Sequence, residues 1–165
     1  MAEPRRVSSD ESGDLKGARI LIVEARFYDD IADELLKGAT RALEKAGAAF
    51  DRVSVPGSLE IPPAITIALD AAERAGRPYE GAVALGCVIR GETTHYDYVC
   101  GESARGLQSL ALEHGLAIGF GVLTVENEGQ ALARARVDKK NKGGEAANAC
   151  LAMIELKRHF GLGDA

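Results

Sequence analysis

No apolar stretch of this sequence is long enough to cross a membrane. A membrane-spanning helix needs roughly 18 or more apolar residues in a row, and no run approaches that length. The N-terminal stretch, MAEPRRVSSDESGDLKG, also lacks the apolar centre of a signal peptide. We therefore expect a cytoplasmic protein without a membrane partner.

Cysteine is scarce, and positive charge is in the minority. Cys87, Cys100 and Cys150 are odd in number, widely spaced and without a CxxC pair, which predicts reduced thiols and neither a disulfide framework nor a zinc site. The 20 Lys and Arg residues against 25 Asp and Glu residues give a net charge of −5. This balance opposes nucleic-acid binding, and an anionic ligand would need a local basic pocket.

The composition is that of one ordinary globular domain. Hydrophobic residues make up 46% and charged residues 27% of a chain of 165 residues, which is typical of a folded protein of single-domain size. Residues 1–14 are polar and lack periodicity, which predicts a flexible leader. The folded domain is expected to comprise residues 15–165.

Four apolar runs have the length and composition of strands. They are residues 18–25, 50–55, 81–89 and 117–125. The third run, GAVALGCVI, is apolar almost throughout, as expected of a strand that is covered on both faces.

Helical periodicity separates these strands. It predicts a first helix that ends at Gly47, a second with Pro62 and Pro63 in its first turn, a third before the last strand, and two more at residues 128–136 and 145–160. The apolar markers are, in chain order, Ile31, Leu35, Ala39, Leu43 and Ala46; Ile61, Ile65, Leu69 and Ala72; Val99, Gly106, Leu107 and Leu110; and, in the last stretch, Ala146, Ala149, Met153 and Phe160.

The order of these elements, βαβαβαβαα, predicts an α/β fold. Such alternation is typical of a parallel sheet with right-handed crossovers and helices on both faces. We therefore expect a three-layer αβα sandwich around a four-stranded parallel sheet. Ligands should gather at the carboxyl ends of the strands.

The segment after the third strand, GCVIRGETTHYDYV at residues 86–99, carries the most informative polar residues. Thr94 and Asp97 have the spacing of a capping box, which predicts a helix start near Thr94. The amides of Glu92 and Thr93 would lie just before that helix, where a phosphate fits. Many capping boxes begin helices that bind nothing, so on this signal alone a purely structural role is favoured.

His95 falls in the first turn of the same helix, at the end of a strand. An imidazole there could exchange protons with a substrate near neutral pH, which makes it a candidate catalytic residue. The alternative is a surface histidine without a role.

Two other strand ends carry candidate binding groups. After the second strand, Gly57 permits a close backbone approach, and Ser58 and Glu60 provide polar groups for hydroxyls or a pyrimidine edge. After the first strand, Phe27 places an aromatic ring where a planar heterocycle could stack. The alternatives are an ordinary helix cap and a core phenylalanine.

The last third of the chain contains a basic cluster in an otherwise acidic protein. An arginine of this cluster could bind a phosphate with two hydrogen bonds, although most of its members are expected to be solvated charges. The cluster consists of Arg134, Arg136, Lys139, Lys140 and Lys142.

Together these segments resemble the lumazine synthases. The matching segments are ARF, PGSLEIP, GCVIRGETTHYDYV, FGVLT with QALARA, and NKGGEAA, in the order and spacing of that family, from about Leu15 to Phe160. The RGETTHYDYV segment is the most specific of them. The resemblance implies a flavodoxin-like sheet, small-molecule substrates and no metal or organic cofactor, and the sequence offers no cluster of metal ligands.

The resemblance also implies residue roles. Phe120 would lie in the neighbouring subunit's share of the site, and Arg134, with Lys142 near it, would bind phosphate. Ala133 and Asp138 depart from the family pattern, in which many members carry glutamate and lysine there. Phe27 would stack on the pyrimidine, and Ser58, Leu59 and Glu60 would bind the pyrimidine and ribityl groups. The backbone of Cys87, Val88 and Ile89 would contact the pyrimidine. The amides of Glu92 and Thr93 would bind phosphate, and His95 would transfer protons.

The implied reaction joins 5-amino-6-(D-ribitylamino)uracil to 3,4-dihydroxy-2-butanone 4-phosphate in riboflavin biosynthesis. Two other classes of protein remain as alternatives: a flavodoxin-like flavin-binding or storage protein without catalysis, and a mainly structural shell-forming protein. The resemblance also implies a homo-oligomer with active sites between adjacent subunits. It leaves room for an association with riboflavin synthase.

Members of this family form pentamers or shells of twelve pentamers, and shell-formers usually carry a glycine between the last two helices. This chain has ARVDKKNK at residues 135–142, with no glycine before Gly143. The β-branched Val137 is also a poor choice for positive φ. We therefore expect a homopentamer rather than a 60-subunit shell.

Overall fold

The computed structural model describes residues 15–163, so the predicted flexible leader at residues 1–14 lies outside the described residues. The strands are β1 (Arg19–Ala25), β2 (Ala49–Val55), β3 (Gly81–Ile89) and β4 (Ala117–Val125). The helices are α1 (Asp29–Lys45), α2 (Ile61–Arg74), α3 (His95–His114), α4 (Glu128–Ala135) and α5 (Lys142–His159), with a 3-10 turn η1 (Ser58–Glu60) before α2.

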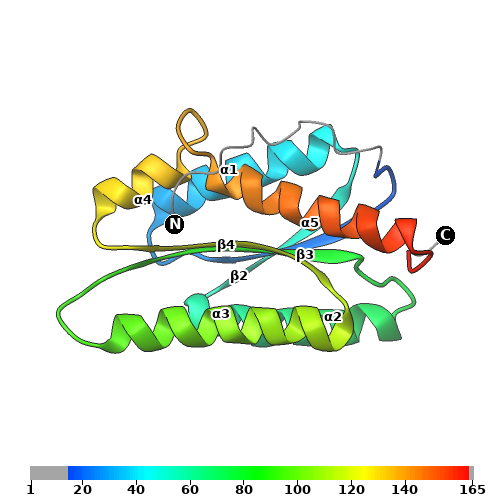
Figure 1. The fold of residues 1–165 in the computed structure, drawn as a ribbon, viewed down its shortest axis with the longest axis horizontal. Helices are drawn as coiled ribbons and strands as arrows, with labels where there is room; N and C mark the ends of the chain where they lie inside the picture. The colour runs from blue at the N-terminus through cyan, green and yellow to red at the C-terminus, as the bar shows by residue number, and fades with distance from the viewer. Residues whose placement is uncertain (1–14, 164–165) are drawn as a thin grey trace.

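These elements form the expected three layers. The four strands are all parallel, in the order β2-β1-β3-β4. Helices α2 and α3 cover one face of the sheet, and α1, α4 and α5 cover the other (Figure 1). All four carboxyl ends therefore meet at one edge of the sheet, as the alternating sequence pattern predicted.

The two central strands have no solvated face. Side chains alternate between the faces of a strand, so in β1 Ile20 and Ile22 pack under α1 and α5, whereas Leu21 and Val23 pack against α2 and α3. All four are completely buried. The two cores lie on opposite sides of one sheet. This confirms the prediction of strands that are covered on both faces.

Helix α3 starts near the predicted residue, but the predicted capping box is wrong. Thr94 has helical backbone angles, and its side chain caps no amide. The amide of Asp97 donates instead to the main-chain oxygen of Thr94 at 3.0 Å, and the Asp97 carboxylate pairs with Arg90 at 3.4 Å. The hydroxyl of Thr93 accepts a hydrogen bond from the amide of His95 at 3.4 Å. The first turn is therefore capped from one residue earlier than the pattern suggested.

Helix α5 begins three residues before its predicted start. Asn141 caps the helix, because its side-chain oxygen accepts a hydrogen bond from the amide of Gly144 at 3.2 Å. A Cβ atom at Gly143 would lie 2.0 Å from the main-chain oxygen of Leu35, so glycine there lets α5 lie directly against α1. Glycine is unfavourable in the interior of a helix. The sequence pattern therefore predicted a helix start after Gly143 and Gly144.

The predicted apolar stripe of α5 is also wrong for most of its residues. Ala146 is buried, but Ala149, Met153 and Phe160 are exposed. The face toward the core is formed by Ala147, Cys150, Leu151 and Ile154. Apolar residues occur around most of this helix, so their spacing could not identify the face that packs on the sheet.

The connection between α4 and α5 reaches positive φ without a glycine. Asn141 has φ 46°, and it is the only non-glycine residue with positive φ within residues 15–163. Asparagine tolerates this region better than other non-glycine residues. The lack of glycine before Gly143 therefore does not exclude a left-handed turn between these helices.

Candidate active site at the carboxyl edge of the sheet

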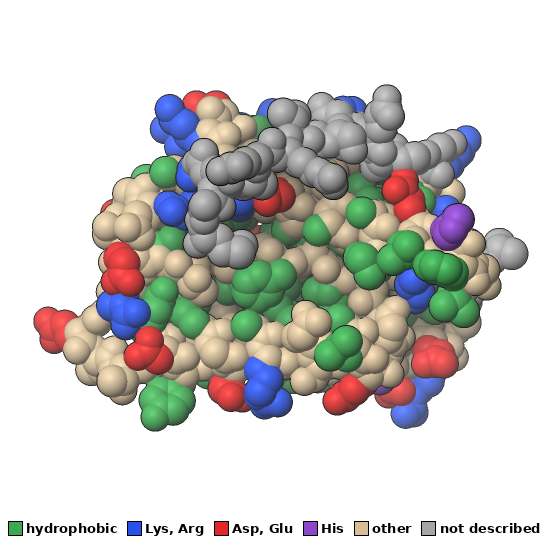
Figure 2. All heavy atoms as spheres, in the orientation of Figure 1, with side chains coloured by type: hydrophobic (Ala, Val, Ile, Leu, Met, Phe, Trp, Pro, Cys, Tyr) green, Lys and Arg blue, Asp and Glu red, His purple; other side chains and the backbone are tan. Residues whose placement is uncertain are grey.

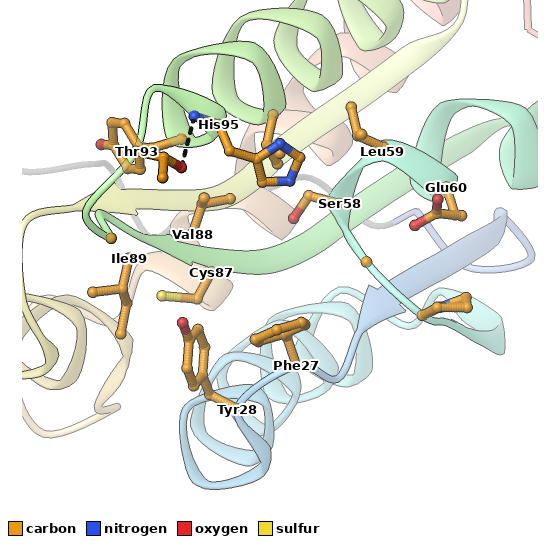
Figure 3. A pocket seen from close by; sticks show the side chains of 15 residues that line it. Phe27, Tyr28, Ser58, Leu59, Glu60, Cys87, Val88, Ile89, Thr93 and His95 are labelled. Atoms are coloured by element: carbon orange, nitrogen blue, oxygen red, sulfur yellow. Dashed lines mark hydrogen bonds between the residues drawn. The ribbon is translucent and has the colours of Figure 1, made fainter.

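One cavity of about 460 Å³ opens where β1, β2 and β3 end (Figure 3). Its walls come from the turn after β1, from the loop and 3-10 turn after β2, from the last residues of β3, and from the start of α3. This is the place where a parallel sheet presents groups to a ligand.

Most of the predicted site residues meet in this cavity. Phe27 and Tyr28 stand on one side of it, whereas Ser58 and His95 stand on the other (Figure 3). Gly86 makes room for this arrangement, because a Cβ atom there would lie 3.0 Å from the hydroxyl of the buried Ser58. The predicted residues that line the cavity are Phe27, Ser58, Leu59, Glu60, Cys87, Val88, Ile89, Thr93 and His95.

Glu92 and Phe120 do not line the cavity of their own chain. Glu92 is exposed, in the loop between two lining residues, Gly91 and Thr93. Phe120 lies on the edge strand β4, is 48% exposed, and borders a separate hollow beside α3. Figure 2, which faces the β4 edge, shows hydrophobic side chains gathered between α3 and the layer of α5.

Arg134 and Lys142 also lie away from the cavity. Arg134, on α4, donates a hydrogen bond to the main-chain oxygen of Gln130 at 3.0 Å. Lys142 begins α5 and pairs with Glu145. Within one chain, the two basic residues that the sequence predicts for phosphate binding therefore do not reach the other predicted residues.

The cavity has no lysine or arginine among its lining residues within the described part of the chain. Arg90, which lies between the lining residues Ile89 and Gly91, is engaged elsewhere. Its guanidinium lies over the ring of Tyr96, 4.1 Å from the centroid, and pairs with Glu126 at 2.9 Å and Asp97 at 3.4 Å. A phosphate in this cavity would therefore meet main-chain amides but no lysine or arginine of the same chain.

A buried carboxylate that the sequence analysis missed supports the wall after β1. Glu24 is only 1% exposed. It accepts hydrogen bonds from Arg26 at 3.1 Å and Ser54 at 3.0 Å, and it pairs with Arg52 at 3.5 Å. These partners offset the cost of burying its charge. The signal in the sequence was a single acidic residue inside the apolar run LIVEA.

Arg26 extends this network to the first turns of α1. Its guanidinium pairs with Asp29 at 3.0 Å and also with Asp33. The hydrogen bond with Asp33 raises the pKa of Arg26 above its usual value, with further contributions from Glu24 and Asp29. Arg26 therefore stays charged and ties the end of β1 to α1, which fixes the turn that carries Phe27.

Two consecutive aromatic rings form the wall on this side. Phe27 is 70% exposed, and its ring meets that of Tyr28 edge to face, with centroids 5.1 Å apart and planes at 68°. Such a pair is a favourable arrangement of aromatic quadrupoles. Phe27 thus presents a supported ring to the cavity. Tyr28 was not singled out from the sequence.

Cys87 presents a thiol to the same cavity, and this thiol is almost completely buried. It is 6% exposed. Burial raises the pKa of Cys87 to about 12, with smaller contributions from Asp30 and Cys100. Because the thiolate is the nucleophilic form, Cys87 can contribute its main chain and a neutral sulfur, but not a nucleophile.

Residues 15–163 contain neither a metal-binding cluster nor a helix that could span a membrane. No group of three or more His, Cys, Asp and Glu side chains could hold a metal ion. In the same range, no helix is long and apolar enough to cross a membrane.

Comparison with known proteins points to one family. The model of the 6,7-dimethyl-8-ribityllumazine synthase family matches residues 17–158. A 6,7-dimethyl-8-ribityllumazine synthase of Afipia carboxidovorans is 61% identical over 158 residues, covering 96% of this chain and 97% of the relative. One of Azorhizobium caulinodans is 57% identical, covering 96% and 98%. A 6,7-dimethyl-8-ribityllumazine synthase 1 of Rhodopseudomonas palustris is 54% identical, covering 97% and 98%.

The raised pKa of Cys87 generates a testable prediction. At pH 8 its thiolate fraction should be about a thousandfold below that of an ordinary thiol, so iodoacetamide should alkylate it at least about 100-fold more slowly in the folded protein than in urea. The rate should increase with pH even above pH 9, because the thiol is still mostly protonated there. Peptide mass mapping measures the modification. Equal rates in folded and unfolded protein would contradict the assigned burial and pKa.

Proposed function

The chain belongs to the 6,7-dimethyl-8-ribityllumazine synthase family, and from that premise we infer that the cavity at the carboxyl edge of the sheet is one chain's share of the active site. The chain is a transferase of riboflavin biosynthesis. It condenses 5-amino-6-(D-ribitylamino)uracil with 3,4-dihydroxy-2-butanone 4-phosphate to form 6,7-dimethyl-8-ribityllumazine. Family membership disfavours the alternative of a flavin-storage protein without catalysis.

The chemistry of the reaction demands positioning more than activation. The 5-amino group of the pyrimidine attacks the ketone of the phosphosugar, and loss of water gives an imine. Elimination of phosphate then gives an enol, which tautomerises to a ketone at the carbon that carried the hydroxyl group. The ribitylamino nitrogen closes the second ring on this new carbonyl carbon, and a second water is lost. Both substrates are intrinsically reactive, so holding them in the right geometry and excluding water supplies most of the acceleration.

We propose that the pyrimidine stacks on Phe27. The exposed face of that ring, braced from the side by Tyr28, supports this placement. Ser58, Leu59 and Glu60 would hold the ribityl and pyrimidine groups from the opposite wall, and the backbone of Cys87, Val88 and Ile89 would hydrogen-bond the pyrimidine edge.

The phosphate is proposed to bind at the start of α3 with help from another chain. The amides of Glu92 and Thr93 precede a helix N-terminus, which favours an anion. The observation that carries the proposal is that the cavity's lining residues, within the described part of the chain, include no lysine or arginine. Arg134 of a neighbouring subunit, with Lys142 near it, would supply the positive charge. Asp138 cannot, because it is acidic, and it pairs with Arg136 at 3.0 Å.

His95 is proposed to move protons between the amine, the carbonyl oxygens and water. It is the first residue of α3 and lines the cavity opposite Phe27 (Figure 3). The reaction needs proton transfers at each addition and each elimination, and an imidazole can serve as both acid and base. The direct test of the function is formation of fluorescent lumazine from both substrates by the purified protein.

The enzyme is a homo-oligomer, as its family implies, and we propose that it is a pentamer. A closed ring already gives every cavity a neighbour, and a larger shell would add contacts that the site does not use. Phe120 on the exposed β4 edge is proposed to border the neighbour's cavity. We also propose a cytoplasmic location, because all three cysteines are free thiols, as in proteins of reducing compartments.

The first prediction for this function concerns Arg134. Arg134→Ala should raise the Michaelis constant for the butanone phosphate about 10- to 100-fold, because a charge-assisted pair with phosphate is lost, and should change that for the pyrimidine by less than about threefold. Steady-state kinetics with each substrate varied in turn measures both. Arg74→Ala, which removes an exposed arginine paired with Asp70, is the control. Equal effects on the two substrates would remove Arg134 from phosphate binding.

Replacement of His95 should slow the chemistry without abolishing it. His95→Ala is expected to lower kcat by about 10- to 100-fold, since the substrates also condense slowly unaided. Lumazine fluorescence measures the rate, and His114→Ala, at the other end of α3, controls for loss of a histidine. A fully active His95→Ala enzyme would contradict the proposed proton transfer.

The assembly is predicted to have a mass of about 87 kDa, five times the 17.4 kDa of one chain. Light scattering on a sizing column measures it at physiological pH and salt. A particle of about 1 MDa, the mass of sixty chains, would refute the pentamer. Co-elution with riboflavin synthase on the same column would test the expected association.

A further inference from the structure

Tyr28 brings a hydroxyl group to the aromatic wall of the cavity, and the proposed mechanism gives this group no role. The side chain is half-buried and lines the cavity beside Phe27 and Cys87. Figure 3 shows its hydroxyl pointing into the cavity on the side of the Cys87 sulfur. Burial and the nearby Cys87 raise the pKa of this hydroxyl. No hydrogen bond contributes to that shift within residues 15–163.

Tyr28 has no structural task that would explain this hydroxyl. It precedes the first residue of α1 with an extended backbone, φ −124° and ψ 104°, and its side chain caps no amide of the helix. Its ring braces Phe27 edge to face, which a phenylalanine would do equally well. The fold therefore does not require the hydroxyl oxygen of Tyr28.

We propose that Tyr28 is a specificity-determining residue, whose hydroxyl donates a hydrogen bond to a carbonyl oxygen on the ring of the pyrimidine substrate. The inference rests on the proposed stacking of that ring on Phe27. It adds a contact from a side chain to those that the main chain of β3 would make.

The geometry of the aromatic pair carries this assignment. The planes of the Phe27 and Tyr28 rings meet at 68°, so Tyr28 stands as a wall beside any heterocycle that stacks on Phe27. A stacked ring lies parallel to Phe27 and therefore turns its edge toward that wall. The edge of a pyrimidinedione carries carbonyl oxygens, which are hydrogen-bond acceptors.

The state of the hydroxyl favours donation. Burial raises the pKa of Tyr28 above its usual value of 10.0, so the group keeps its proton at neutral pH and beyond. A half-buried hydroxyl that loses water on ligand binding must find a partner in the ligand or lose a hydrogen bond. A ring with an acceptor at this position is thus preferred over one without, which is the basis of specificity by a hydrogen bond.

The test is the isosteric variant Tyr28→Phe, which removes only the oxygen and keeps the brace for Phe27. The probe is a non-reacting analogue of the pyrimidine substrate with a nitro group in place of the 5-amino group. Its dissociation constant, measured by calorimetry on the assembled enzyme, should increase about 3- to 10-fold. Unchanged binding would overturn the inference.

Tyr79→Phe is the matched control. The hydroxyl of Tyr79 is bound to Asp51 at 2.7 Å, and this residue precedes β3, at the opposite end of the strand from the cavity. Loss of that hydroxyl should leave analogue binding within about twofold of the wild type. Equal weakening in both variants would assign the effect to the fold and overturn the role of Tyr28.

A second arm separates a bond to the ring from a bond to the ribityl chain. The same nitropyrimidine carrying a methylamino group instead of the ribitylamino group should still bind about 3- to 10-fold more weakly to Tyr28→Phe. If the difference disappears with this probe, the hydroxyl serves the ribityl chain and the assignment is wrong. A wild-type enzyme that forms no lumazine would overturn the proposed function instead, so the two failures are distinguishable.

Discussion

Burial of the two central strands on both faces is the constraint from which the rest of this structure follows, because it leaves those strands with no exposed surface on which chemistry could occur. The buried side chains of β1 and β3 pack against α1 and α5 on one face of the sheet and against α2 and α3 on the other. Only the carboxyl ends remain. Since parallel strands end together, three of these ends meet around one cavity.

Glu24 is the exception to this apolar packing, and it shows how the edge of the sheet is made rigid enough to hold a site. An isolated carboxylate at 1% exposure would be strongly unfavourable, but Arg26, Arg52 and Ser54 surround it. Because Arg26 also grips α1, the turn between strand and helix is held at both ends. The aromatic wall of the cavity stands on that turn.

Local features of the sequence were enough to predict the layers and most of the candidate residues that line the cavity. Uninterrupted apolar runs identified the buried strands, and strand ends identified Phe27, Ser58 and His95, which the structure brings together. The failures involve contacts between distant segments. The face of α5 depends on packing against the sheet, and its start depends on Asn141 and on the approach of Gly143 to α1. Tyr28 was missed because the sequence does not show that its side chain lines the same cavity as the neighbouring Phe27.

A cavity without a lysine or arginine of its own has a consequence for inheritance. If the charge comes from the adjacent chain as proposed, a lesion at Arg134 damages the neighbour's site and spares the cavity of the chain that carries it, whereas a lesion at His95 damages only its own. Two inactive alleles of these kinds, expressed in one cell, would assemble rings in which some sites combine a sound cavity with a sound arginine. Such alleles would complement each other, although neither encodes a working enzyme.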